Sequence, residues 1–177
     1  MAKNDDAIWK SLIASRSPIA RAGANADAGV YALFLATGSL PHVAPAADGL
    51  LYIGMTDSSL VSRNPLTHKS SGFSTLRRSL GSLLRAKLAL VPIPRSAGSS
   101  PNLFKFSSDG EIRLTKWIIE HLDYGCAIIA DDRDKLKKRL IGISEPPLNL
   151  TGWKNPLSKE IEARRKECVI DANRYRA

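Results

Sequence analysis

Two apolar runs separated by a turn-rich stretch constrain the fold of this chain more than any other feature. Gly29–Leu35 (GVYALFL) is continuous and contains aromatic residues, and Leu50–Met55 (LLYIGM) has the same character. Runs of this length and composition, bounded by Gly, Pro, Asn and Asp, are typical of strands. A loop of Gly, Pro and Ala residues, Gly38–Gly49, lies between them. We therefore expect the two runs to pair as neighbouring strands.

Apolar residues at helical spacing predict the elements around these strands. Acidic residues or Ser and Thr precede several of the helical patterns, as is usual at a helix N-terminus. We expect helices over Asp6–Ser15, Ser74–Leu90, Glu111–Leu122, Asp132–Ile143 and the exposed C-terminal stretch after Asn155-Pro156, and a third strand over Tyr124–Ala130. Thr56–Gly72 is polar and irregular, and Val91–Ser100, rich in Pro, Ser and Gly, is expected to be a surface loop.

These elements predict an α/β fold of the α+β type. A small, mainly antiparallel central sheet is flanked by helices, with additional helices at the N- and C-terminal ends lying on the outside. With 177 residues and 44% hydrophobic content, the chain can bury one substantial core. No internal repeat is present.

The net charge indicates the class of partner, and the cysteine spacing excludes some kinds of site. With 26 Lys and Arg against 17 Asp and Glu, the formal net charge is +9, which favours a polyanionic partner such as DNA or RNA. Cys126 and Cys168 lie far apart without a CxxC spacing, so zinc and redox motifs are absent. No run approaches the roughly 20 apolar residues of a membrane span, and Met1–Ser15 lacks the pattern of a secretory signal. We expect a cytoplasmic protein with no membrane partner.

The strands carry triplets with a specific resemblance. Gly29-Val30-Tyr31 lies on the first, Tyr52-Ile53-Gly54 on the second, and Pro146-Pro147-Leu148-Asn149 follows a late helix. The order of these motifs resembles the GIY-YIG endonuclease superfamily, from about Gly29 to Leu150. The resemblance divides the chain into an N-terminal helical extension (1–28), a nuclease-like domain (29–150) and a C-terminal helix (151–177).

The resemblance implies hydrolysis of a DNA phosphodiester with one divalent metal, Mg²⁺ or Mn²⁺, held by a glutamate. Tyr31 and Tyr52 match the motif tyrosines, with Tyr52 the better candidate to face phosphate or water; without the family match, both could be ordinary sheet aromatics. A tyrosine hydroxyl can accept a proton from attacking water, and an arginine can neutralise charge on the phosphoryl group. That arginine is expected early on the first core helix, where we favour Arg78 over its neighbour Arg77.

Other residues are assigned around this constellation. His68 is a candidate second acid or base in the polar stretch before the helix, although a loop histidine is more often a surface residue. Asn149 matches the family asparagine that orients the site from its edge; its alternative role is to satisfy a turn after Pro-Pro. The expected phosphate contacts are Arg63, Lys69, Arg77, Arg85, Lys137, Lys138 and Arg139.

The metal-binding glutamate is the point of departure from the family. The family pattern E-x-x-L-I reads Lys137-Lys138-Arg139-Leu140-Ile141 in this chain. A lysine cannot ligate Mg²⁺, and its charge repels the ion. Three interpretations stay open: the chain binds DNA without cutting it, Lys137 supplies positive charge at the phosphate, or Glu145 or Asp134 provides a ligand.

Three functions follow. The first is a metal-dependent DNA endonuclease with Tyr31, Tyr52, Arg78 and Asn149 at the phosphate, and a homodimer is possible because one such site cuts one strand. The second is a nucleic-acid-binding protein that has the fold but has lost the metal. The third is a basic RNA- or protein-interaction module in which these residues would not converge.

Overall fold

The computed structural model describes residues 3–22, 26–63, 66 and 70–175, and for Lys3, Asn4 and Arg63 the backbone only. The helices are α1 (Lys3–Ala14), α2 (Leu60–Arg63), α3 (Thr75–Leu84), α4 (Ser108–His121), α5 (Arg133–Ser144) and α6 (Ser158–Asn173), with 3-10 turns η1 (Ile19–Arg21), η2 (Ala47–Gly49) and η3 (Ser71–Phe73). The strands are β1 (Ser17–Pro18), β2 (Gly29–Leu35), β3 (Leu50–Thr56), β4 (Pro92–Pro94), β5 (Phe104–Phe106) and β6 (Leu122–Ile128).

The expected strand pair forms the centre of a four-stranded sheet of order β1-β6-β2-β3, in which every neighbouring pair is antiparallel. Tyr31 lies opposite Gly54 on β3 and opposite Cys126 on β6. The register between β2 and β3 shifts between Leu33 and Phe34, so Leu33 faces Tyr52 and Phe34 faces Leu50. The predicted α/β fold with a small antiparallel sheet is confirmed.

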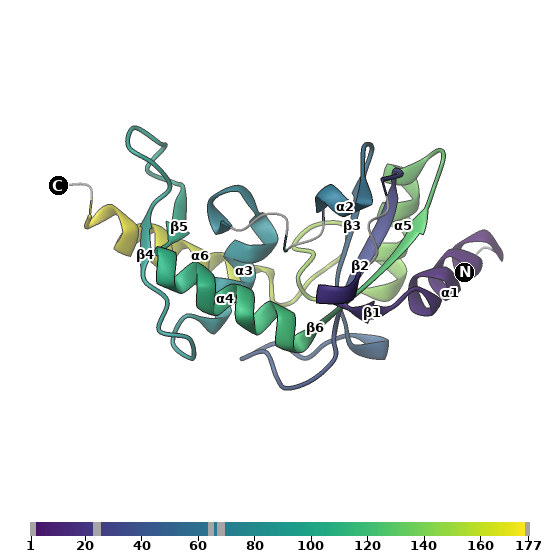
Figure 1. Cartoon of the computed structure of the whole chain (residues 1–177), viewed down its shortest axis with the longest axis horizontal. Coiled ribbons are helices and arrows are strands. Elements are labelled where there is room, and N and C mark those ends of the chain that lie inside the picture. The colour runs from purple at the N-terminus through teal and green to yellow at the C-terminus, as the bar shows by residue number, and fades with distance from the viewer. Residues whose placement is uncertain (1–2, 23–25, 64–65, 67–69, 176–177) are drawn as a thin grey trace.

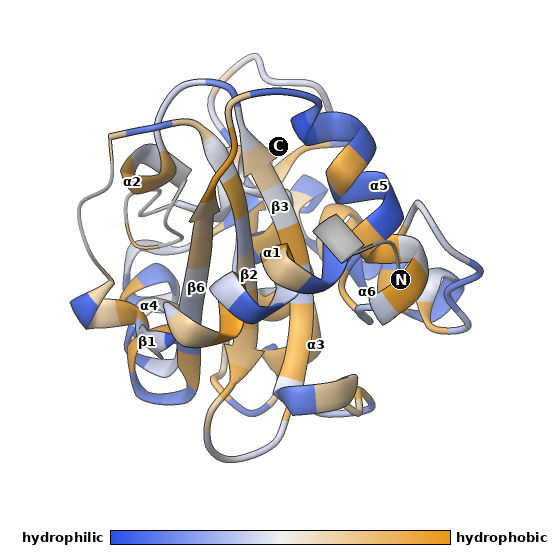
Figure 2. Cartoon of the chain, turned by 90° about the vertical axis from the view of Figure 1, so that its right-hand side faces the viewer, coloured by the Kyte–Doolittle hydropathy of each residue, from blue (hydrophilic) through white to orange (hydrophobic). Residues whose placement is uncertain are grey.

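The sheet separates two apolar clusters because successive side chains of a strand point to opposite faces. One cluster contains Tyr31 and Leu33 together with leucines of α3, and residues of α4 and α6 complete it. The other contains Val30 and Ala32 with residues of α1 and α5. Figure 1 shows the sheet with α1 and α5 in one half of the molecule and α3, α6 and the β4–β5 hairpin in the other. Figure 2 shows α5 with hydrophilic residues on its outer side, next to the largely hydrophobic β3.

Local sequence fixes where several helices begin. The Ser74 hydroxyl caps α3 by accepting a hydrogen bond from the amide of Arg77, and the Ser107 hydroxyl caps α4 by accepting one from Gly110. The loop predicted over Val91–Ser100 instead contains β4, which pairs with β5.

The C-terminal helix is more deeply packed than predicted. Ile161, Cys168 and Ala172 on α6 are almost completely buried and belong to the same cluster as Tyr31. The expected amphipathic helix is thus present, and its apolar face packs on α3 and on both strands of the β4–β5 hairpin. No helix in the described ranges is long and apolar enough to cross a membrane.

Candidate functional site

Three tyrosines from three adjacent strands lie on one face of the sheet. The ring of Tyr31 stacks on that of Tyr124 with centroids 5.6 Å apart, and its centroid is 6.1 Å from that of Tyr52. Tyr31 and Tyr124 are buried, whereas Tyr52, on the outer strand β3, is partly exposed. Of these three rings, that of Tyr52 is therefore the one placed to meet a solvent-borne substrate.

Gly54 makes room for the ring of Tyr31. A Cβ atom at this position would lie 2.3 Å from Cζ and 2.4 Å from Oη of Tyr31, far inside van der Waals contact. The glycine of the Tyr-Ile-Gly triplet is thus required by the tyrosine of the Gly-Val-Tyr triplet, since the two residues are direct partners in the strand register. The two motifs form one packing unit.

Asn149 holds the outer edge of β3 with its side chain. Its Oδ1 accepts a hydrogen bond of 2.8 Å from the amide of Ile53, and its Nδ2 donates one of 2.9 Å to the carbonyl of the same residue. The amide of Leu148 also donates to the carbonyl of Leu51. The buried Asn149 side chain therefore acts like a further strand residue and fixes the backbone on either side of Ile53, next to Tyr52 and Gly54.

Tyr124 was not singled out from the sequence, yet it connects the sheet to α2. Its hydroxyl donates a hydrogen bond of 3.2 Å to the carbonyl of Leu60, the first residue of α2, and burial raises the pKa of this hydroxyl well above its usual value. Helix α2 ends at Arg63 and follows directly after β3. It therefore places the backbone of Arg63 on the tyrosine side of the sheet, whereas the side chain of Arg63, together with His68 and Lys69, lies outside the described residues.

The two adjacent arginines of α3 have different surroundings. Arg78 donates hydrogen bonds to the carbonyls of Ser71 and Gly72 and to the Thr75 hydroxyl, and it lines a hollow between α3 and α6. None of these contacts involves a motif tyrosine, so the proposed place of Arg78 at the reacting phosphate has no support from them. Arg77 is completely buried, which leaves it no access to a nucleic acid and corrects its assignment as a phosphate contact.

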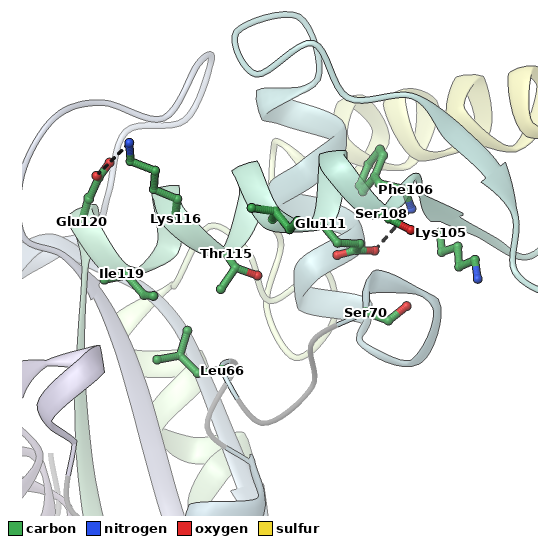
Figure 3. A pocket seen from close by; sticks show the side chains of 11 residues that line it. Leu66, Ser70, Lys105, Phe106, Ser108, Glu111, Thr115, Lys116, Ile119 and Glu120 are labelled. Carbon is green, nitrogen blue, oxygen red and sulfur yellow. Dashed lines mark hydrogen bonds and ion pairs between the residues drawn. The ribbon is translucent and has the colours of Figure 1, made fainter.

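Arg77 instead forms a buried ion pair with Glu111 of α4, with Nη2 and Oε2 2.9 Å apart. The other carboxylate oxygen, Oε1, accepts hydrogen bonds from the amide and the hydroxyl of Ser71. It also accepts one from the amide of Phe106, which Figure 3 shows. These bonds offset the desolvation of both charges and join η3, α3, β5 and α4. No motif in the sequence indicates this network. A groove of about 800 Å³ beside it is lined by Leu66, Ile112 and Ile119 among others, and by neither motif tyrosine.

The basic run on α5 is largely matched by carboxylates. Lys137 and Lys138 both pair with Asp134, at 3.0 and 2.6 Å. Arg139 pairs with the buried Asp5 of α1 at 3.0 Å, and away from α5 the predicted phosphate-binding residue Arg85 pairs with Asp171 of α6. The two lysines on Asp134 lower the pKa of its carboxyl, and Lys138 has the larger effect. These ion pairs leave α5 less electropositive than its sequence indicates.

The described residues do not form a metal site built from several protein ligands. Mg²⁺ prefers several oxygen ligands, and in the part of the chain that the structure describes no three His, Cys, Asp or Glu residues are grouped to hold an ion. Lys137, which the sequence motif predicts at the position of the family glutamate, shares Asp134 with Lys138. Glu145 is exposed, at the left-handed C-cap of α5. No chemical step is therefore assigned to a metal.

The small antiparallel sheet, the paired tyrosines on adjacent strands and the asparagine at the sheet edge define an α/β domain with a polar aromatic site. The GIY-YIG catalytic domain model matches residues 29–168, which is most of the chain, and the chain belongs to this family. The match extends beyond residue 150 into α6, consistent with the burial of that helix. No curated protein and no solved structure matches the chain. Membership of the family indicates nuclease-like function and a nucleic-acid substrate.

Proposed function

We propose that this chain is a DNA endonuclease in which Tyr52 faces the scissile phosphodiester. The observation that carries the proposal is the stack of Tyr124, Tyr31 and Tyr52, which is buried at its inner end and reaches solvent at Tyr52. Asn149 is a positioning residue here, because it fixes the backbone of β3 beside Tyr52. The net charge of +9 favours a polyanionic substrate, and we propose that the protein meets DNA in the cytoplasm.

In the proposed reaction, the oxygen of a water molecule forms a bond to phosphorus while the bond from phosphorus to the leaving ester oxygen breaks. The proton of the water passes to the Tyr52 oxygen while Tyr52 releases its own hydroxyl proton to solvent, and the leaving oxygen takes a proton from solvent. We assign the charge-neutralising role to Arg63 rather than to Arg78, because α2 adjoins the tyrosine face. One such site cuts one strand, so a double-strand break would require a homodimer or two successive cuts.

A specific observation favours a second function, DNA binding without hydrolysis. In the sequence motif Lys137 takes the place expected for the family's carboxylate, and in the described ranges no three His, Cys, Asp or Glu residues are grouped to hold an ion. In this case the tyrosine face and its cationic surroundings bind DNA, and no phosphodiester is cut.

A supercoiled-plasmid nicking assay, with and without Mg²⁺ or Mn²⁺, separates the two functions. The first function predicts nicking by wild type that is lost in Tyr52→Phe and retained in the matched control Tyr175→Phe, which alters an exposed tyrosine on the C-terminal side of α6. Arg63→Ala and Arg78→Ala identify the arginine that matters.

Absence of nicking by wild type, with tight DNA binding and nicking by Lys137→Glu in Mg²⁺, would establish the second function. Nicking that is equally strong in wild type and Tyr52→Phe would refute the role given to Tyr52. A chain that neither cuts nor binds DNA would refute both functions.

A further inference from the structure

Three arginines that lie outside α5 have no ion-pair partner among the described residues. Most basic residues singled out above pair with a carboxylate on their own or a neighbouring helix. Arg78 of α3, Arg95 in the segment after β4 and Arg165 of α6 form no ion pair within the described ranges. Three distant parts of the sequence therefore bring guanidinium groups to one place.

The backbone of η3 anchors two of these arginines. Arg78 donates a hydrogen bond of 3.0 Å to the carbonyl of Gly72. The stem of Arg95 packs over the same glycine, where a Cβ atom would lie 2.9 Å from its Cγ. The guanidinium of Arg95 lies 5.3 Å from the centre of the Phe73 ring, and its buried Nε has no hydrogen-bond partner. The two charges are thus held in place at η3 without a carboxylate.

The third arginine faces them from α6. Arg165, together with Lys166 and Arg78, lines a hollow of about 410 Å³, and its remaining lining residues are Asn102, Leu103, Phe104, Glu162 and Val169. Burial lowers the pKa of Arg78, and the charges of Arg165 and Arg95 lower it further. Burial also lowers the pKa of Arg165, while Glu162, one helical turn earlier, opposes this change. Like charges at this spacing repel each other, and a bound anion would relieve the repulsion.

We propose that this hollow, lined by Arg78 and Arg165, binds a phosphate of the DNA backbone together with Arg95 at the neighbouring η3, at a second contact point away from the tyrosine face. We call the three arginines the arginine notch. Guanidinium groups suit phosphate because their planar N–H donors bind its oxygens in pairs. The strands β2, β3 and β6, which carry the tyrosines, and α3, α6 and the β4–β5 hairpin lie in different halves of the molecule along its longest axis (Figure 1). A DNA strand touching both is held over a long stretch of surface. The inference rests on the proposed action on DNA and adds a binding site to it.

Fluorescence anisotropy with a labelled duplex of about 20 base pairs, titrated between about 50 and 200 mM salt, tests the notch. Arg95→Gln and Arg165→Gln are each expected to weaken binding about tenfold at fixed salt, as removal of a charge-assisted hydrogen bond does. The slope of log K against log salt should fall by about 0.9 for each DNA phosphate that the variant no longer neutralises. Arg164→Gln is the matched control, because Arg164 is a neighbour on α6 that pairs with Glu160 at 2.9 Å.

Unchanged affinity and salt slope in the Arg95 and Arg165 variants, with wild type binding DNA, would overturn the notch alone. Failure of wild type to bind DNA would refute the proposed function and the notch with it. Thermal melting with inorganic phosphate separates the sources of the anion. Stabilisation of wild type that the variants lose, without any change in their DNA affinity, would show that the notch takes free phosphate and would overturn DNA as its ligand.

Discussion

Replacing Asn149 with alanine tests whether one side chain holds the outer edge of the sheet. The substitution removes its two hydrogen bonds to Ile53, of 2.8 and 2.9 Å. Ile53 is completely buried, so its amide and carbonyl would lose their partners where water has poor access. A buried polar group left without a partner costs about 1–3 kcal/mol, and relaxation of an edge strand recovers part of this cost. We expect Asn149→Ala to lower the free energy of unfolding by about 3 kcal/mol.

For a chain of this size, each kcal/mol shifts the melting temperature by about 2–4 °C, so a decrease of roughly 6–12 °C is expected. Urea unfolding followed by circular dichroism gives the free energy directly. Asn149→Asp provides a sharper comparison, because an ionised carboxylate retains the acceptor for the Ile53 amide but faces the Ile53 carbonyl without a donor. It should therefore be destabilised at neutral pH despite its nearly identical shape.

Asn102→Ala is the matched control, since Asn102 is exposed, and its replacement should change stability by less than about 0.5 kcal/mol. The reasoning would be refuted if Asn149→Ala lost less than about 1 kcal/mol, or if Asn149→Asp were as stable as wild type at neutral pH. Either result would mean that the edge of β3 does not depend on the Asn149 amide.

Three further predictions concern the interior. Arg77→Met leaves the Glu111 carboxylate buried without its cation and should cost about 3–5 kcal/mol in urea unfolding, whereas adding Glu111→Gln should restore much of that stability. Gly54→Ala forces the ring of Tyr31 to move and should cost about 1–3 kcal/mol, with a matching decrease in any nicking activity. Burial raises the pKa of Cys168 to about 11. The buried neutral thiol therefore contributes fully to the free energy of unfolding below the pKa of the unfolded thiol, about 9, and this contribution is lost as the pH rises towards 11. Urea unfolding at a series of pH values, together with slow thiol labelling of the native protein at pH 8, would check this pH dependence.

The sequence predicted the central strands well because their signal is local. Gly29–Leu35 matches β2, and Leu50–Met55 matches β3 except for its last residue. The β4–β5 hairpin was missed because Pro92 and Pro94 are typical of a loop. They are tolerated in β4 because this strand pairs on one side, with β5, and needs no further ladder hydrogen bonds.

The site residues that belong to the sequence motifs could be predicted from the sequence, whereas the contacts that depend on tertiary packing could not. The triplets placed Tyr31 and Tyr52 on adjacent strands, and the run from Tyr124 already predicted a third strand with an aromatic residue on it. The ion pair between Arg77 and Glu111 has no such signal, since its partners are 34 positions apart. A charge pattern along one helix cannot show which of two adjacent arginines will be buried.

The same limit applies to the cationic surface. On α5 the lysines stand out in the sequence, but Asp134, in the first turn of that helix, holds two of them, and Asp5 holds Arg139 from another helix. Arg78, Arg95 and Arg165 are scattered in the sequence, and the turn at η3 and the packing of α6 on α3 bring them together. A lysine in an ion pair must leave its carboxylate before it can bind phosphate, whereas an arginine without an ion-pair partner does not. DNA affinity should therefore depend more on Arg165 than on Lys138. Comparing Arg165→Gln with Lys138→Gln in the same anisotropy assay tests this order, and a larger decrease in affinity for the lysine variant would contradict it.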